Sequence, residues 1–299
     1  MPIRSFFIGL LRHVGEKKFG TLVEKVAASS IRTVVPGIAG AAILTGTLGQ
    51  ISIGATIPIS ATEANRIGRR IWINECGGTV SGLTSWNAGE NFASLGIGHF
   101  IWYPRGQRGP FEESFPKLVG FVSARGAKLP EFLLPGHDAA CPWNSRAEFL
   151  RDQDAPKMKQ LRAFLVDTID LQTQFLIARL EAALPKMIAE APAGERDNVQ
   201  RQFDRLASSP SGCYALVDYV NFKGEGVLHT ERYKGEGWGL LQVLEQMHGA
   251  GNGTSAAREF SNSAAAMLRR RVQNSPPERH EARWLPGWLN RVHSYSENS

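Results

Sequence analysis

Cysteine is scarce in this chain of 299 residues: only Cys76, Cys141 and Cys213 are present. Three cysteines are too few for a disulfide framework, and their spacing matches no Cys-x-x-Cys metal site. An exported chain could hold one disulfide and one free thiol, whereas a chain in a reducing compartment would hold three thiols. We expect at least one of the three to be a small buried hydrophobic residue.

The chain also lacks the short motifs of several enzyme classes. It contains no His-Glu-x-x-His zinc motif and no Gly-x-Ser-x-Gly nucleophile elbow. The glycine-rich runs "GEGWG" and "GAGNG" lack the strand and helix context of a phosphate-binding loop. The sequence therefore predicts neither a metal nor a cofactor.

Positive charge is in excess, with a formal net charge of +6. Such a balance favours an anionic partner, which could be nucleic acid, an anionic membrane or an anionic cell-wall polymer. The basic run "LRRRV" at residues 268–272 is not accompanied by the exposed aromatic residues typical of nucleic-acid modules. We therefore expect no nucleic acid among the partners.

Charge is absent from residues 33–62, which follow a basic segment. The centre of this stretch, "VVPGIAGAAILTGTLGQISIGATIPI", is long enough to cross a bilayer, which takes about 20 residues. A basic segment followed by an apolar one is typical of export signals and membrane anchors. Residues 1–60 are therefore predicted to be an export signal or anchor, with membrane association through residues 33–60 and a periplasmic or cell-envelope location. The alternative is a surface loop of a cytosolic protein.

A helix is predicted over residues 61–76. Ser60 and Glu63 have the spacing of a capping box, and Gly77-Gly78 suits a left-handed C-terminal cap. Glu75 shares a face with the apolar residues four and eight positions before it, so it should be buried at the helix end. Burial and the negative end of the helix dipole would both raise the pKa of Glu75, as a general acid requires. The plainer interpretation is a solvated or capping carboxylate.

The rest of the chain predicts an α+β fold. Residues 79–103 combine turn formers with "FASLGIGHFIWY", which is typical of short strands, and residues 104–144 look rich in loops. Beyond them the predicted helices cover residues 145–151, 156–166, 168–190, 195–207, 211–220, 237–248, 255–272 and 278–293. One helix, a small sheet and then many helices is an α+β order.

The pair "NECGG" and "ASLGIGHF" resembles the phage-type lysozymes (muramidases) of the lysozyme-like superfamily over residues 61–103. In that family a glutamate ends the first domain helix and faces a Thr-x-Gly-x-Gly-His turn. The resemblance implies a mostly helical fold with a small glycine-rich sheet beside the catalytic helix. Residues 61–299 would then form the catalytic domain, with the β part at about 77–105 and the helical lobe at about 145–293.

The resemblance also implies roles for individual residues. Glu75 would be the general acid. Ser94 stands where the family has threonine and would position water or a carboxylate. Gly96 and Gly98 would let a polymer approach closely, and His99 would order the turn.

The family's second catalytic group is harder to place. No aspartate lies between Glu75 and the glycine turn. Thr84 has roughly the family's offset from Glu75, and Glu90 is the only other carboxylate in the loop, so we take Glu90 as the second acid. Its alternative is an exposed loop residue. If neither Thr84 nor Glu90 serves, a single-acid mechanism similar to that of lytic transglycosylases follows.

A second stretch, residues 218–247, mixes aromatic and acidic residues with glycines. Sugar rings stack on aromatic side chains and their hydroxyls bond to carboxylates, so Tyr219, Glu225, Glu236 and Trp238 are candidate glycan-binding residues. The alternative is a turn that enters a core helix, with Trp238 simply buried.

These observations lead to one functional expectation: an exported peptidoglycan hydrolase that cleaves β-1,4 bonds of murein or a related glycan polymer. The first alternative is a non-catalytic glycan-binding protein of the cell envelope on the same fold. The second is a lytic transglycosylase or a chitosanase-like glycosidase, since one fold serves several glycans.

Overall fold

The computed structural model describes residues 57–109, 111–135 and 140–297, which belong to one compact unit. The predicted export signal or anchor, apart from its last four residues, lies outside the described residues. Among the described residues, no helix combines the length and the apolar character that a membrane span needs.

Helix α1 (Ala61–Cys76) forms as predicted. The Glu63 backbone N–H donates to Ser60 Oγ at 3.2 Å, and the Ser60 N–H donates to Glu63 Oε2 at 3.0 Å, which completes the capping box. The helix ends at Gly77, whose φ of 62° is left-handed. Ile71 and Glu75 are buried on one face of α1, as their spacing predicted.

A small antiparallel sheet follows α1 and a short 3-10 turn, η1 (Ser81–Leu83). Its strands are β1 (Thr84–Ser85), β2 (Ala93–Leu95) and β3 (Phe100–Trp102), in that order across the sheet. Ser85 lies opposite Ser94, and Leu95 lies opposite Phe100. The loop of residues 86–92 and the turn of residues 96–99 therefore leave β2 from its two opposite ends.

The helices after residue 145 agree closely with prediction. They are α3 (Arg146–Arg151), α4 (Pro156–Asp167), α5 (Ile169–Glu190), α6 (Arg196–Ala207), α7 (Pro210–Lys223), α8 (Leu240–Gln246), α9 (Thr254–Asn274) and α10 (Leu285–Glu297). The predicted helix over residues 237–248 is shorter, because a hairpin of β4 (Arg232–Tyr233) and β5 (Glu236–Gly237) precedes it. The predicted helix over residues 278–293 is instead two 3-10 turns, η3 (Pro277–Arg279) and η4 (Glu281–Arg283), followed by α10.

One prediction was wrong within the loop-rich region. Residues 104–144 contain helix α2 (Phe115–Ser123) and a 3-10 turn, η2 (Glu131–Leu133). Phe115, Leu118 and Val122 of α2 are fully buried at helical spacing. Pro116 lies in the first turn, where proline is tolerated because its missing N–H has no partner within the helix. A proline within the region predicted to be rich in loops therefore marks the start of a helix.

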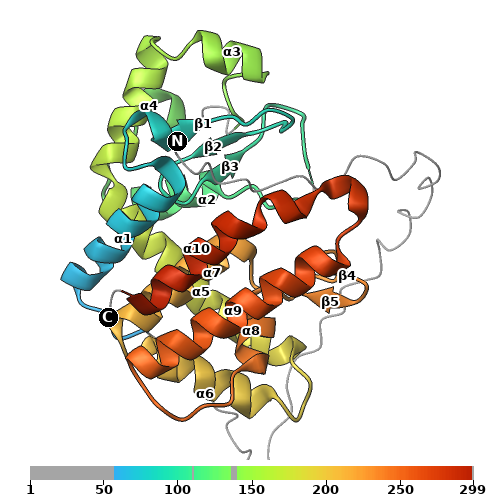
Figure 1. Cartoon of the computed structure of the whole chain (residues 1–299). Coiled ribbons are helices and arrows are strands. Elements are labelled where there is room, and N and C mark those ends of the chain that lie inside the picture. Colours follow the sequence, from blue (N-terminus) through green and yellow to red (C-terminus); the bar gives the residue numbers. More distant parts are fainter. Residues whose placement is uncertain (1–56, 110, 136–139, 298–299) are drawn as a thin grey trace, which may run out of the picture. The chain divides into compact units, whose positions relative to one another are not determined.

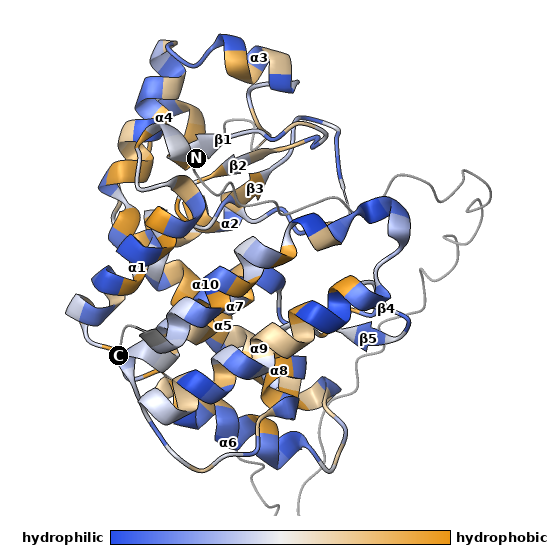
Figure 2. Cartoon of the chain, viewed as in Figure 1, coloured by the Kyte–Doolittle hydropathy of each residue, from blue (hydrophilic) through white to orange (hydrophobic). Residues whose placement is uncertain are grey.

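Figure 1 shows the sheet together with α2, α3 and α4 in one part of the described unit and α6 to α10 in the other. Helix α5 packs against α1 and α2 and also against α6 and α7. Hydrophobic residues lie mainly between the helices, and hydrophilic ones cover their outward faces (Figure 2). The turn of residues 96–99 rests on α5, because the Ile97 N–H donates to Gln172 Oε1 at 2.9 Å.

Packing against α5 also explains the glycine at position 96. Gly96 has a φ of 68°, and a Cβ there would clash with Gln172 Oε1. We expect Gly96→Ala to lower the free energy of unfolding by about 2–4 kcal/mol, because it adds backbone strain to a steric clash. Chemical denaturation measures this.

The matched control is Gly120→Ala in α2, where a Cβ would meet nothing within 4 Å. This change should be neutral or stabilising by up to about 1 kcal/mol. Equal stabilities of the two variants would contradict the packing explanation.

Candidate active site

Glu75 is the meeting point of three segments that are distant in the sequence. Its carboxyl, at the end of α1, is 1% exposed. Oε1 accepts a hydrogen bond from Arg291 Nη2 of α10 at 2.6 Å. Oε2 lies 3.4 Å from Nδ1 of His99, which belongs to the turn between β2 and β3. The structure thus brings together Glu75 and His99, as the resemblance implied, and adds Arg291.

Arg291 is itself fixed by a second carboxylate, that of Asp218 in α7. Arg291 Nε donates to Asp218 Oδ2 and Arg291 Nη2 donates to Oδ1, both at 2.8 Å. The Tyr295 hydroxyl donates to the same carboxylate at 2.6 Å, and Asn74 Nδ2 donates to it at 3.3 Å. Asp218 is fully buried. With its oxygens engaged in this way, Asp218 orients the guanidinium that contacts Glu75.

The charges of this cluster follow from burial and from neighbours. Burial lowers the pKa of His99; the attraction of Glu75 opposes this shift and Arg291 adds to it, so His99 is neutral near neutral pH. Burial would also lower the pKa of Arg291, but Asp218 and Glu75 outweigh it and raise that pKa well above its usual value. Arg291 is therefore a permanent cation.

Two effects act on the charge of Glu75 in opposite directions. Burial disfavours the ionised carboxylate. The contact with Arg291, which the sequence did not reveal, favours the ionised form. If Glu75 gave up a proton, the guanidinium of Arg291 would already be in place to stabilise the remaining carboxylate.

Glu90 is not brought next to Glu75. It lies in the loop of residues 86–92, where Asn87 Nδ2 donates to Glu90 Oε1 at 3.0 Å and Trp86 Nε1 donates to the Glu90 carbonyl at 2.9 Å. His99, beside Glu75, follows the other end of β2. At about 3.3 Å per residue, the strand separates these two ends by roughly 10 Å.

Glu90 has an unusual environment of its own. Its Oε2 is buried and has no hydrogen-bond partner within the described part of the chain. Burial raises the pKa of Glu90 to about 7 from an ordinary value of 4.5, and the bonds from Asn87 oppose this shift only in part. A raised pKa in the folded state stabilises the fold below the unfolded-state value, and this contribution is lost as pH rises through 7.

This shift predicts a pH-dependent stability. Between about pH 5 and about pH 8, the wild-type protein should lose about 2–3 kcal/mol more unfolding free energy than Glu90→Gln, which never ionises. Urea denaturation of both proteins at the two pH values measures the difference. Parallel pH profiles would show that the Glu90 carboxyl is solvated.

The other two candidates of the sheet are buried. Thr84 Oγ1 accepts from Arg162 Nε at 2.9 Å, so its hydroxyl helps to hold α4 on the sheet. Ser94 lies on β2, and its carbonyl accepts from Ser85 Oγ at 3.3 Å. Gly98 packs on the Phe100 ring, which a Cβ would approach to 2.7 Å. Close packing thus accounts for these positions without a bound polymer.

The four candidates in residues 218–247 divide into two kinds. Tyr219 and Trp238 are buried; the Tyr219 hydroxyl donates to the Trp238 carbonyl at 2.8 Å. Glu225 pairs with Lys186 of α5 at 3.0 Å, and Glu236 pairs with Arg270 of α9 at 3.1 Å. The interpretation of this stretch as a turn that enters a core helix therefore accounts for Trp238.

The three cysteines are free and buried; the sequence predicted burial for at least one of them and left open whether two form a disulfide. Burial raises the pKa of each thiol, to about 12 for Cys141 and to about 11 for Cys213. In the part of the chain that the structure describes, no cluster of three or more His, Cys, Asp or Glu residues could hold a metal ion.

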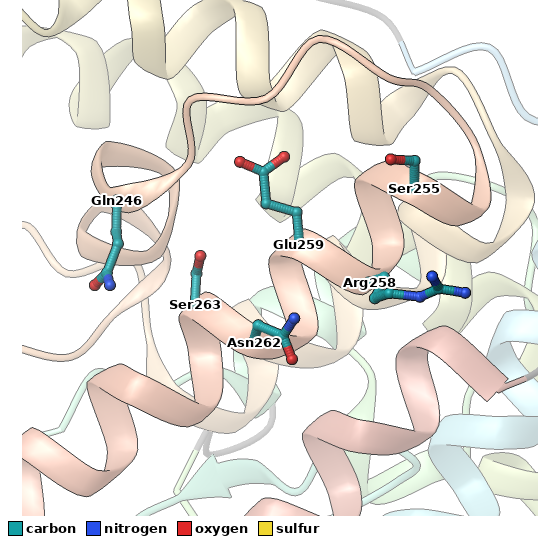
Figure 3. A pocket seen from close by; sticks show the side chains of 6 residues that line it. All are labelled: Gln246, Ser255, Arg258, Glu259, Asn262 and Ser263. Atoms are coloured by element: carbon teal, nitrogen blue, oxygen red, sulfur yellow. The ribbon is translucent and has the colours of Figure 1, made fainter.

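A pocket of about 450 Å³ lies along α8 and α9 (Figure 3). Its lining residues are Gln246, Ser255, Arg258, Glu259, Asn262 and Ser263. Glu259 Oε1 accepts from the N–H groups of His248 and Gly249, each at 2.8 Å, and Oε2 accepts from Arg205 at 2.9 Å. The acid of this pocket therefore holds the preceding loop, and the lining includes none of the predicted site residues.

No protein-family model, no curated protein and no solved structure matches this chain. The cluster around Glu75 is therefore the main structural indication of function.

Proposed function

We propose that the protein is a glycosidase of lysozyme-like fold that cleaves the β-1,4 bonds of peptidoglycan glycan strands, with Glu75 as its general acid. The supporting observation is the contact of Glu75, at the end of α1, with His99 of the glycine turn. The α+β order of the elements agrees with such a fold. This substrate implies a periplasmic or cell-envelope location.

In this proposal protonated Glu75 gives its proton to the glycosidic oxygen as the bond to the anomeric carbon breaks. Arg291, 2.6 Å from Oε1, then stabilises the carboxylate that remains. Because the Glu75 side chain is 1% exposed, neighbouring groups must move before a glycan reaches it.

The position of the second acid favours a single-acid form of the reaction. Glu90 lies at the opposite end of β2, and Asp218 is engaged by Arg291 and Tyr295. Water, or a hydroxyl of the sugar itself as in lytic transglycosylases, would then complete the reaction without a protein nucleophile.

The burial of Glu75 favours a second candidate, a non-catalytic glycan-binding protein of the cell envelope. In that case the contacts of Glu75 with Arg291 and His99 serve only to join α1, α10 and the sheet.

Incubation of the purified protein with murein sacculi distinguishes these functions. We expect the suspension to clear, with soluble products that carry reducing ends if water attacks and anhydro sugars if the sugar hydroxyl attacks. Parallel reactions on chitin and chitosan test the choice of glycan. Sedimentation of the protein with murein without release of any product would reject the glycosidase and support the binding protein.

A further inference from the structure

The outward face of α1 carries a stripe of exposed residues. Thr62, Arg66, Arg69 and Ile73 follow one another at intervals of four, three and four, which places them on one side of a helix. Ile73 is 61% exposed, and Val80, just beyond the helix, is 46% exposed. Two cations and one large aliphatic side chain therefore lie on one side of α1, and a second large aliphatic side chain is exposed in the loop that follows.

The charge of Arg66 is offset in part by Glu63, which lies one turn before it on α1. Neither Arg66 nor Arg69 makes an ion pair or hydrogen bond with another described residue. The stripe also contains no carboxylate. Its charge is complementary to an anionic surface, and its exposed aliphatic residues would be stabilised by an apolar one.

A bilayer with anionic lipids combines these two properties. Basic residues next to apolar ones on one helix face are typical of helices that lie on membrane surfaces. The chain before α1 points to the same partner, because residues 33–62 carry no charge and lead directly into the first turn of the helix.

We propose that the outward face of α1, formed by Thr62, Arg66, Arg69 and Ile73 and extended by Val80, docks on a bilayer that contains anionic lipids. Glu75 lies on the opposite, buried side of the same helix. Docking therefore leaves the candidate acid on the side away from the lipid. This inference does not depend on the glycosidase proposal.

A fluorescent label at position 73 tests the docking. The three native cysteines are buried, so Ile73→Cys offers the accessible thiol for an environment-sensitive label. The full chain is reconstituted in zwitterionic vesicles and in vesicles with about a third of anionic lipid. We expect a blue-shifted emission and quenching by lipid-borne quenchers in the anionic vesicles alone. Leu228→Cys, at an exposed residue after α7, is the control and should keep its aqueous emission.

The arginines are tested in the same labelled protein. Arg66→Gln with Arg69→Gln should lower the ratio of docked to undocked protein about 25-fold, because each basic residue near an anionic surface contributes about fivefold. Arg258→Gln with Arg269→Gln removes the same charge from exposed positions on α9 and should leave this ratio unchanged.

Three results would overturn the proposal. The first is equal emission in both kinds of vesicle. The second is an equal loss of docked protein in the Arg66/Arg69 and Arg258/Arg269 double variants. The third is an emission shift produced by murein sacculi but not by vesicles. The last result would mean that a cell-wall polymer covers the stripe. Murein cleavage is measured separately, so failure of docking and failure of the glycosidase proposal remain distinguishable.

Discussion

Arg291→Met is expected to lower the free energy of unfolding by about 3–5 kcal/mol, because it leaves buried carboxylates without their cation. Asp218 is fully buried and receives two hydrogen bonds from Arg291, and Glu75 receives a third. Methionine keeps most of the apolar volume of the arginine side chain, so the loss reports mainly on the charge. Chemical denaturation followed by circular dichroism measures it.

A second substitution separates charge from packing. In the Arg291→Met background, Asp218→Asn should cost less than it does in the wild-type protein, because the carboxylate that it removes has already lost its partner. Arg270→Met breaks an exposed pair with Glu236 and should cost about 1 kcal/mol or less. If Arg291→Met costs no more than this surface control, the buried network does not form in solution.

Glu75→Gln is expected to slow the release of soluble sugar from murein by about 100-fold or more, because an amide cannot serve as the proton donor. Glutamine has nearly the shape of glutamate and keeps an oxygen that accepts from Arg291. The substitution should therefore leave the fold and the sedimentation of the protein with murein unchanged. Initial rates of reducing-end or anhydro-sugar formation give the comparison.

Glu190→Gln is the matched control, because it makes the same chemical change at a partly exposed carboxylate that pairs with Arg232 and lies outside the candidate site. It should keep the wild-type rate. A wild-type rate in Glu75→Gln would remove the general-acid assignment. If the variant is slow but also less stable than the wild-type protein, the result fits a Glu75 that only joins α1, α10 and the sheet.

The parts of the fold that local signals determine were predictable. The capping box at Ser60 and the glycine after Cys76 are both visible in the sequence, so the bounds of α1 and the position of Glu75 at its end were predicted correctly. Helix α2 was missed because Pro116 and the surrounding glycines suggest loops, although Phe115, Leu118 and Val122 form a buried helical face.

The partners of Glu75 were less predictable. Asp218 lies inside an apolar stretch of α7, whereas Arg291 lies between Asn290 and Val292 in α10. A charge within an apolar run indicates a buried polar contact, but it does not identify the partner. Arg291 lies 73 residues from Asp218 and 216 from Glu75, so only the packing of α1, α7 and α10 brings the three together.

Distance along the chain was also misleading for Glu90. It is closer to Glu75 in sequence than Asp218 is, yet the register of the hairpin carries it to the far end of β2. The pairing of strands of only two or three residues is supported by contacts with α4 and α5, such as those of Thr84 with Arg162 and of Ile97 with Gln172. These contacts are not visible in the spacing of the residues.

The bond between Arg291 and Glu75 has a consequence for the order in which the protein is made. At a synthesis rate of about 5–20 residues per second, the arginine follows the glutamate by roughly 10 to 40 seconds. During this interval α1 and the sheet can fold, but the carboxyl of Glu75 has no guanidinium beside it. The cluster at Glu75 is therefore completed late, only after α10 has been made and packs against α7 and α9.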